Sequence, residues 1–92
     1  MIQSFKDRDT RRFYDGQRVR EFDGIKKAAA RKLDMLNAAA NLNDLRSPPG
    51  NRLEALAGDR AGQHSIRIND QYRVCFEWTE QGPANVEITD YH

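Results

Sequence analysis

The chain has 92 residues, of which 38% are hydrophobic and 32% charged, and its formal net charge is +1. This length supports one small domain over residues 1–92, and the single cysteine, Cys75, excludes an internal disulfide framework. The longest aliphatic runs are alanine triplets and the start of the chain has no apolar signal region, so we expect a cytoplasmic protein without a membrane partner.

The first half of the chain carries helical patterns. Residues 2–5 are expected to form a short edge strand and residues 7–15 a brief helix. The clearest helix is predicted over residues 22–40, with Asp23 as its N-cap, because apolar side chains recur there at steps of three and four. These side chains are Phe22, Ile25, Ala29, Leu33, Leu36 and Ala40.

After Gly50 the apolar pattern changes to alternation, which is typical of strands. Strands are predicted over residues 53–56, 64–69 and 72–79, and a last one around Val86 and Ile88. Short turns between neighbouring strands imply an antiparallel sheet of about four to five strands. The order of elements predicts an α+β fold, in which the short N-terminal strand and two helices pack on one face of this sheet.

The sheet face left uncovered by the long helix is where we expect function. Alternation along the strands places Arg67, Arg73, Cys75 and Glu77 there. Eleven of the fifteen basic residues are arginine, which favours bidentate contacts to phosphate or carboxylate. A solvated basic helix face is an equal alternative. Cys75 is expected to be a packed thiol rather than a nucleophile.

Charge is distributed unevenly along the chain. Residues 6–20 carry a net charge of +3 and residues 63–92 a net charge of −3. Since the total is close to zero, long-range attraction to any polyanion should be weak.

Common cofactor motifs are absent from the sequence. There is no phosphate-binding glycine loop, dinucleotide fingerprint or zinc-ligand spacing, so we expect neither a metal nor a cofactor. The sequence ends instead on Asp90-Tyr91-His92, directly after the last predicted strand. All three side chains are able to form hydrogen bonds or transfer protons.

Three segments together resemble the HigB-type toxins of bacterial type II toxin–antitoxin systems, within the RelE/ParE superfamily. They are Met1-Ile2-x-Ser4-Phe5 at the start, Leu56-x-Gly58-Asp59-Arg60-x-Gly62 with the following Ser65-Ile66 and Tyr72-Arg73-Val74, and the terminal Asp90-Tyr91-His92. The resemblance covers nearly the whole chain. It implies a RelE/ParE-like fold and a ribosome-dependent endoribonuclease that cleaves translated messenger RNA in the A site.

The resemblance also implies partners and functional positions. The partners are the ribosome with its mRNA and a cognate helix-turn-helix antitoxin, through which operator DNA is reached. The functional positions that match are Arg73, Asp90, Tyr91 and His92. HigB relatives often carry a histidine where this chain has Glu54, and a lysine where it has Ala57.

Metal-free RNA cleavage needs a base for the 2′-hydroxyl, a cation for the phosphorane charge and an acid for the 5′-oxygen. Here the candidate base is Glu54 or Asp90, and the candidate cation is Arg73, with Arg67 as a supporting RNA-binding residue. The terminal pair completes the set, with His92 as the acid and Tyr91 hydrogen-bonding the phosphate or stacking on a base.

Other interpretations stay open. Arg73 could be a structural arginine that bridges Glu77 or Glu87, and Glu54 a solvated residue paired with Arg52 or Arg67. The whole chain could be a ParE-like inhibitor that blocks a protein such as DNA gyrase without chemistry. It could also be a degenerate toxin that serves as an antitoxin-binding corepressor.

Overall fold

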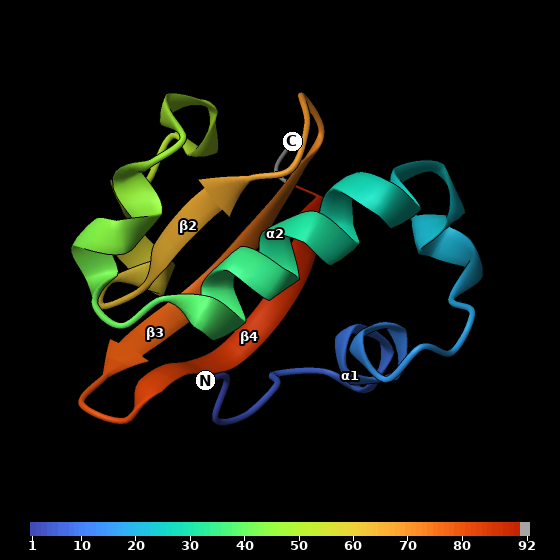
Figure 1. Cartoon of the computed structure of the whole chain (residues 1–92), viewed down its shortest axis with the longest axis horizontal. Helices are drawn as coiled ribbons and strands as arrows, with labels where there is room; N and C mark the ends of the chain where they lie inside the picture. Colours follow the sequence, from blue (N-terminus) through green and yellow to red (C-terminus); the bar gives the residue numbers. More distant parts are fainter. Residues whose placement is uncertain (91–92) are drawn as a thin grey trace.

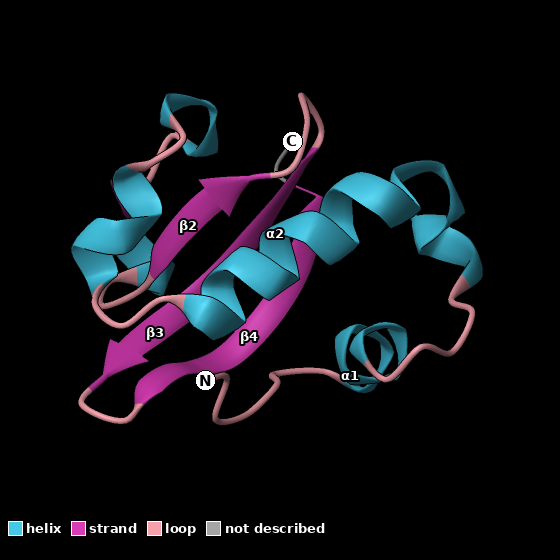
Figure 2. Ribbon diagram, in the orientation of Figure 1, coloured by secondary structure: helices cyan, strands magenta, loops and turns pink. Residues whose placement is uncertain are grey.

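A four-stranded antiparallel sheet with the strand order β1-β2-β3-β4 forms the centre of the computed structural model, which describes residues 1–90. The strands are β1 (Glu54–Ala55), β2 (His64–Arg67), β3 (Tyr72–Thr79) and β4 (Gly82–Asp90). Figures 1 and 2 show the long helix α2 (Lys26–Ala38) lying across one face of this sheet. The predicted α+β fold is therefore confirmed.

The N-terminal part of the chain packs along β4. Helix α1 (Arg8–Tyr14) is capped by Asp7, whose carboxylate accepts a hydrogen bond from the Thr10 N–H at 3.0 Å. The buried Thr10 hydroxyl in turn accepts the Ile88 N–H of β4 at 3.1 Å. The expected N-terminal strand is reduced to one parallel bridge, between Phe5 and Val86.

The predicted start of the long helix is wrong. Residues Arg20–Ile25 form a 3-10 helix, η1, and α2 begins only at Lys26, after an N-cap at Ile25 that makes no side-chain hydrogen bond. Asp23 does not cap the helix, because its carboxylate is bound by Arg18, with 2.7 Å between Arg18 Nη2 and Asp23 Oδ2. Three short 3-10 turns follow α2, namely η2 (Leu42–Arg46), η3 (Pro49–Asn51) and η4 (Gly58–Arg60).

The core lies between α2 and the sheet. Leu33 and Leu36 of α2 are completely buried, and each such side chain contributes about 1.5–3 kcal/mol through the hydrophobic effect. They join one cluster with Phe22, Ile25, Ala29, Leu45, Ile66, Val74, Phe76, Val86 and Ile88. This packing leaves the opposite face of the sheet to the alternate side chains of β2, β3 and β4.

Candidate active site

The register of the strands arranges polar side chains in two rows on the sheet face opposite α2. Directly opposite residues in antiparallel strands share a face. The first row therefore contains Glu54, Ser65, Cys75 and Glu87, which are paired from β1 to β4. The second row contains Arg67, Arg73 and Thr89, paired from β2 to β4.

Arg73 lies at the centre of this face, where hydrogen bonds hold its guanidinium. Its Nε donates to Ser65 Oγ at 2.8 Å, and its Nη2 donates to the Arg52 carbonyl oxygen at 2.7 Å. The Arg73 side chain is only 11% exposed, so the guanidinium has one fixed orientation rather than a mobile, solvated one.

Glu54 lies beside this guanidinium. The distance from Glu54 Oε1 to Arg73 Nη2 is 3.7 Å, and the Glu54 side chain is 50% exposed. The structure thus brings together two of the predicted site residues, a guanidinium that is only 11% exposed and a carboxylate that is half-exposed. The expected alternative partners of Arg73 have other contacts, since Glu77 accepts from Asn85 and Glu87 binds Arg60.

Arg67 is the cross-strand neighbour of Arg73. Two like charges directly opposite each other destabilise a sheet, so each needs a compensating group. For Arg67 the compensating group is Asp70, whose carboxylate in the β2–β3 turn forms an ion pair with the Arg67 guanidinium. The Arg67 side chain is 33% exposed, and it is the third predicted site residue on this face, after Arg73 and Glu54.

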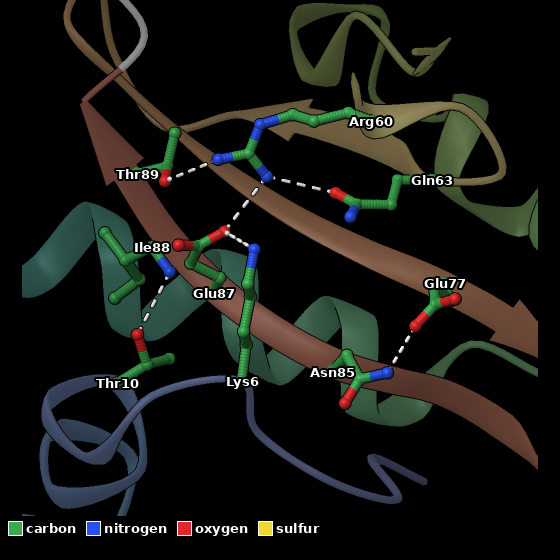
Figure 3. A network of polar contacts seen from close by, with 9 residues as sticks. All are labelled: Lys6, Thr10, Arg60, Gln63, Glu77, Asn85, Glu87, Ile88 and Thr89. Carbon is green, nitrogen blue, oxygen red and sulfur yellow. Dashed lines mark hydrogen bonds and ion pairs between the residues drawn. The ribbon is translucent and has the colours of Figure 1, made fainter. Parts of the chain in front are cut away.

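Arg60 is a member of this face that strand alternation could not reveal. It comes from η4, and Figure 3 shows its side chain extending across the sheet to β4. Its Nη1 lies 3.0 Å from Glu87 Oε1 and 3.1 Å from Gln63 Oε1, and its Nη2 lies 3.5 Å from Thr89 Oγ1. Since Thr89 is paired with Arg73, Arg60 adds a third arginine to the second row. Its only sequence signal is the Gly58-Asp59-Arg60 turn.

A second cation completes the network around Glu87. Lys6 Nζ lies 3.7 Å from Glu87 Oε1, so the N-terminal segment and η4 are both tied to the same carboxylate of β4. Figure 3 shows both cations approaching this carboxylate from different segments. The side chain of Glu87 is 19% exposed, which makes this ion pair less screened by solvent than one on the open surface.

Cys75 lies beneath this polar layer and is completely buried. Burial raises the pKa of its thiol, and the nearby guanidinium of Arg60 only partly opposes that effect. A thiol with a raised pKa is a poor nucleophile at neutral pH. The prediction of a packed thiol is confirmed.

Asp90 does not lie in the row of Arg73. Its position is opposite Tyr72, which packs edge-to-face on Phe22 at 6.3 Å on the helix side of the sheet. The Asp90 carboxylate accepts from Gln71 Nε2 at 2.9 Å. The two other predicted terminal residues, Tyr91 and His92, lie outside the described residues.

Within residues 1–90, no three His, Cys, Asp or Glu side chains are grouped so that they could hold a metal ion. Over the same residues, no helix is both long and apolar enough to cross a membrane.

Comparison with known proteins gives consistent matches. The model of the HigB-like toxin family, described as the RelE-like toxin HigB of type II toxin–antitoxin systems, matches residues 3–92. Toxin HigB-1 of Vibrio cholerae is 43% identical over 90 residues, which cover 96% of this chain and 95% of that protein. An uncharacterized protein of Haemophilus influenzae is 47% identical over 66 residues, which cover 72% of this chain and 64% of that protein.

Proposed function

The chain belongs to the HigB-like toxins of type II toxin–antitoxin systems, and from this premise we propose that it is an endoribonuclease that cleaves mRNA on the translating ribosome. Membership of the family implies a cognate antitoxin as partner. We expect that antitoxin to carry a helix-turn-helix domain, so that operator DNA is reached only through it, and we expect the toxin to act in the cytoplasm.

The proposed reaction needs no metal. Glu54 removes the proton of the ribose 2′-hydroxyl, and the 2′-oxygen forms a bond to phosphorus while the bond from phosphorus to the 5′-oxygen breaks. The guanidinium of Arg73 stabilises the negative charge that develops on the phosphorane oxygens. His92 donates a proton to the leaving 5′-oxygen, and the products are a 2′,3′-cyclic phosphate and a free 5′-hydroxyl.

The remaining site residues bind the substrate in this proposal. Arg67, next to Arg73 in the same row, contacts the RNA backbone. Tyr91 hydrogen-bonds the phosphate or stacks on a base. Asp90 is the alternative base.

The Glu54–Arg73 pair is the observation that supports this proposal best. A carboxylate that is half-exposed can meet a 2′-hydroxyl, and a cation held by Ser65 and the Arg52 carbonyl needs no reorganisation when charge develops. Asp90 is the weaker candidate for the base, because its strand position lies on the helix side of the sheet, opposite Tyr72.

The ribosome has a clear physical role in the proposal. A single acid or base typically contributes about 10²–10⁴-fold to a rate, so a site with few catalytic groups depends on precise substrate placement. The ribosome would hold the A-site codon in one orientation, and orientation of reactants is worth several kcal/mol of barrier. The position where relatives carry a lysine is Ala57 here, which makes this dependence stronger.

The test is induction of the unmodified chain in bacterial cells, followed by mapping of new 5′ ends across the transcripts. New ends confined to translated reading frames are expected in the parent. Arg73→Gln should lower the cleavage rate about 10²–10³-fold, as the loss of one charge-stabilising donor does in other enzymes. Glu54→Gln should lower it by about 10²-fold or more, and His92→Gln should abolish detectable cuts.

Arg46→Gln and Glu80→Gln are the matched controls. Arg46 is exposed in η2 and Glu80 in the β3–β4 turn, and neither lies on the candidate face, so both variants should cleave like the parent. Full activity of Glu54→Gln together with loss in Asp90→Asn would assign the base to Asp90. Growth arrest without new 5′ ends would contradict the nuclease and favour a gyrase-type target, whereas no arrest at all would favour a corepressor.

A further inference from the structure

Strand β1, which carries the proposed base Glu54, is weakly attached to the sheet. It has two residues, both exposed, and it pairs with β2 at two register positions. One further backbone bond, from the Leu56 N–H to the Gln63 carbonyl oxygen at 2.9 Å, extends this pairing. Among residues 1–90, β1 is an edge strand of the sheet. An edge strand this short opens easily unless another contact holds it.

The connection from β1 to β2 is not held by apolar packing. Within residues 57–62, which include η4, all residues are exposed except Arg60, which is partly buried. Gly58 has φ +63° and Gly62 has φ +92°, so the backbone turns sharply on both sides of Arg60. The position of this connection over the sheet therefore depends on polar contacts, and those of Arg60 reach as far as β4.

Arg60 links this connection to β4 through its side chain. Its Nη1 lies 3.1 Å from Gln63 Oε1 and 3.0 Å from Glu87 Oε1, and its Nη2 lies 3.5 Å from Thr89 Oγ1 (Figure 3). Gln63 is bound to Arg60 a second time, because the Gln63 N–H donates to the Arg60 carbonyl oxygen at 3.0 Å. The Gln63 carbonyl oxygen accepts the Leu56 N–H, just after β1. A continuous path of hydrogen bonds therefore runs from β4 through Arg60 to the end of β1.

The far end of this path is firmly fixed. Glu87 lies within the nine-residue strand β4, directly opposite the completely buried Cys75. Lys6 of the N-terminal segment contacts the same carboxylate, with 3.7 Å between Nζ and Oε1. The side chains of Arg60 and Glu87 are 29% and 19% exposed, so solvent screens their ion pair only in part. Arg60 thus joins a weak edge strand to a long, well-paired one.

We propose that Arg60 is a positioning residue for the base Glu54. Its bridge to Glu87 holds β1 in register on β2, and so keeps the Glu54 carboxylate beside Arg73. This inference deepens the proposed function and rests on it, because it takes Glu54 as the base. A base must lie within hydrogen-bond reach of the proton that it removes, and a displacement of about 1 Å can cost about 10²-fold in rate.

A direct contact with RNA would give Arg60 a different signature. Its guanidinium donates to one carboxylate and two neutral oxygens, so binding a phosphate would break contacts that it already makes. The two roles make opposite predictions for Glu87→Gln. A positioning role predicts slower cleavage, because the bridge is weakened. An RNA contact predicts tighter binding and no loss of rate, because Arg60 and Lys6 are released for phosphates.

The first measurement is single-turnover cleavage on purified ribosomes programmed with an mRNA that the parent cleaves. Arg60→Gln should lower the maximal rate about 10- to 10²-fold and leave the half-saturating toxin concentration within about twofold of the parent. Glu87→Gln should lower the maximal rate by a smaller factor. Asp59→Asn is the matched control on the same turn, because Asp59 is exposed and has no ion pair among residues 1–90. Its two parameters should equal those of the parent.

A double variant shows whether Arg60 acts through Glu54. Arg60→Gln combined with Glu54→Gln should cleave no more than about threefold slower than Glu54→Gln alone, because a misplaced base matters little once the base is gone. Arg60→Lys keeps the charge opposite Glu87 and should cleave faster than Arg60→Gln. Full additivity of the two single effects would overturn the proposal, as would a higher half-saturating concentration with an unchanged maximal rate.

Amide hydrogen exchange of the free protein tests the positioning without any reaction. The Leu56 amide should exchange at least about fivefold faster in Arg60→Gln, whereas the amides of the buried Val74 and Phe76 should exchange as in the parent. Unchanged exchange at Leu56 would overturn the proposal, and so would equal acceleration at all three amides, which would show a general loss of stability. If Arg60→Gln does not fold, Glu87→Gln is used for both measurements.

Failure of the proposed function can be distinguished from failure of this inference. A parent chain that does not cleave programmed ribosomes would contradict the nuclease, and exchange at Leu56 would then decide alone whether Arg60 holds β1. Faster exchange at Leu56 in a variant that cleaves like the parent would overturn the positioning role and leave the nuclease intact.

Discussion

Arg73 and Cys75 are two residues apart on the same face of β3, but their side chains have different surroundings. The Arg73 guanidinium contacts Ser65, the Arg52 carbonyl and Glu54, and its side chain is 11% exposed. The Cys75 thiol is completely buried below Arg60 and Glu87. Their difference comes from the segments that cover the sheet, since both residues have the same strand orientation.

The buried thiol leads to a prediction about pH. Burial raises the pKa of Cys75 above its ordinary value of 9.0, so the unfolded chain loses this proton at lower pH than the folded chain. The thiol therefore stops stabilising the folded state as pH rises above 9.0, and that decrease should be smaller in Cys75→Ala. Urea unfolding of both proteins between pH 7 and 11 measures the difference.

A thiol-labelling experiment provides the control for this prediction. At neutral pH the folded chain should react with a disulfide reagent far more slowly than the urea-unfolded chain, because the thiolate is scarce and shielded. Rapid labelling of the folded chain would contradict both the burial and the raised pKa.

Strand β4 is the element that connects the N-terminal segments to the sheet. Helix α1 is bound to β4 by the hydrogen bond that the Ile88 N–H donates to the Thr10 hydroxyl. The first residues of the chain pair with β4 through the bridge between Phe5 and Val86. At its start, Gly82 has φ +130°, and a Cβ there would lie 2.5 Å from the Met1 carbonyl oxygen. Only glycine allows this close approach of the N-terminus.

Gly82→Ala should therefore destabilise the fold. The strained backbone at positive φ costs about 1–3 kcal/mol, and the clash with the Met1 carbonyl must be relieved by moving the N-terminal segment. Gly50→Ala is the matched control, because a Cβ at Gly50 meets nothing within 4 Å. Its unfolding free energy should stay within about 0.5 kcal/mol of the parent or rise slightly. Equal stability of the two variants in urea titrations would show that the N-terminus does not depend on Gly82.

At the scale of the whole molecule, the two sides of the sheet differ in how their charged side chains are arranged. On the helix side, α2 exposes the charged side chains of Lys26, Lys27, Arg31 and Asp34. On the other side, Arg60, Arg67 and Arg73 each have a carboxylate partner, so that face carries little excess charge. The formal net charge of the chain is +1.

This balance predicts weak binding and negligible cleavage of naked RNA. Non-specific affinity for a nucleic acid depends on the phosphates that unpaired Lys and Arg neutralise, so the dissociation constant at physiological salt should be no tighter than about 10⁻⁶ M. Fluorescence anisotropy with a labelled single-stranded RNA measures it. Nanomolar binding, or cleavage of that RNA as fast as of ribosome-bound mRNA, would remove the need for the ribosome.

Local patterns in the sequence were sufficient for much of the fold. The alternation in 72–79 and the helical spacing around Leu33 depend on neighbours within a few residues. They correctly predicted β3 and the body of α2, and which side chains of each point into the core. The start of α2 was not predictable in this way, because Asp23 has the right chemistry for a cap but is bound by Arg18. A competing local contact decided between two acceptable helix starts.

In the candidate site, too, some relations between residues could be predicted from the sequence and others could not. Strand alternation in the sequence determined that Arg67 and Arg73 share the open face, because residues two apart in a strand point to the same side. Only the tertiary structure decided that Glu54 lies 3.7 Å from Arg73, that Arg60 reaches Thr89, and that Asp90 falls in the row of Tyr72. These relations depend on strand register and on how turns cross the sheet, and both are set by packing between segments distant in the chain.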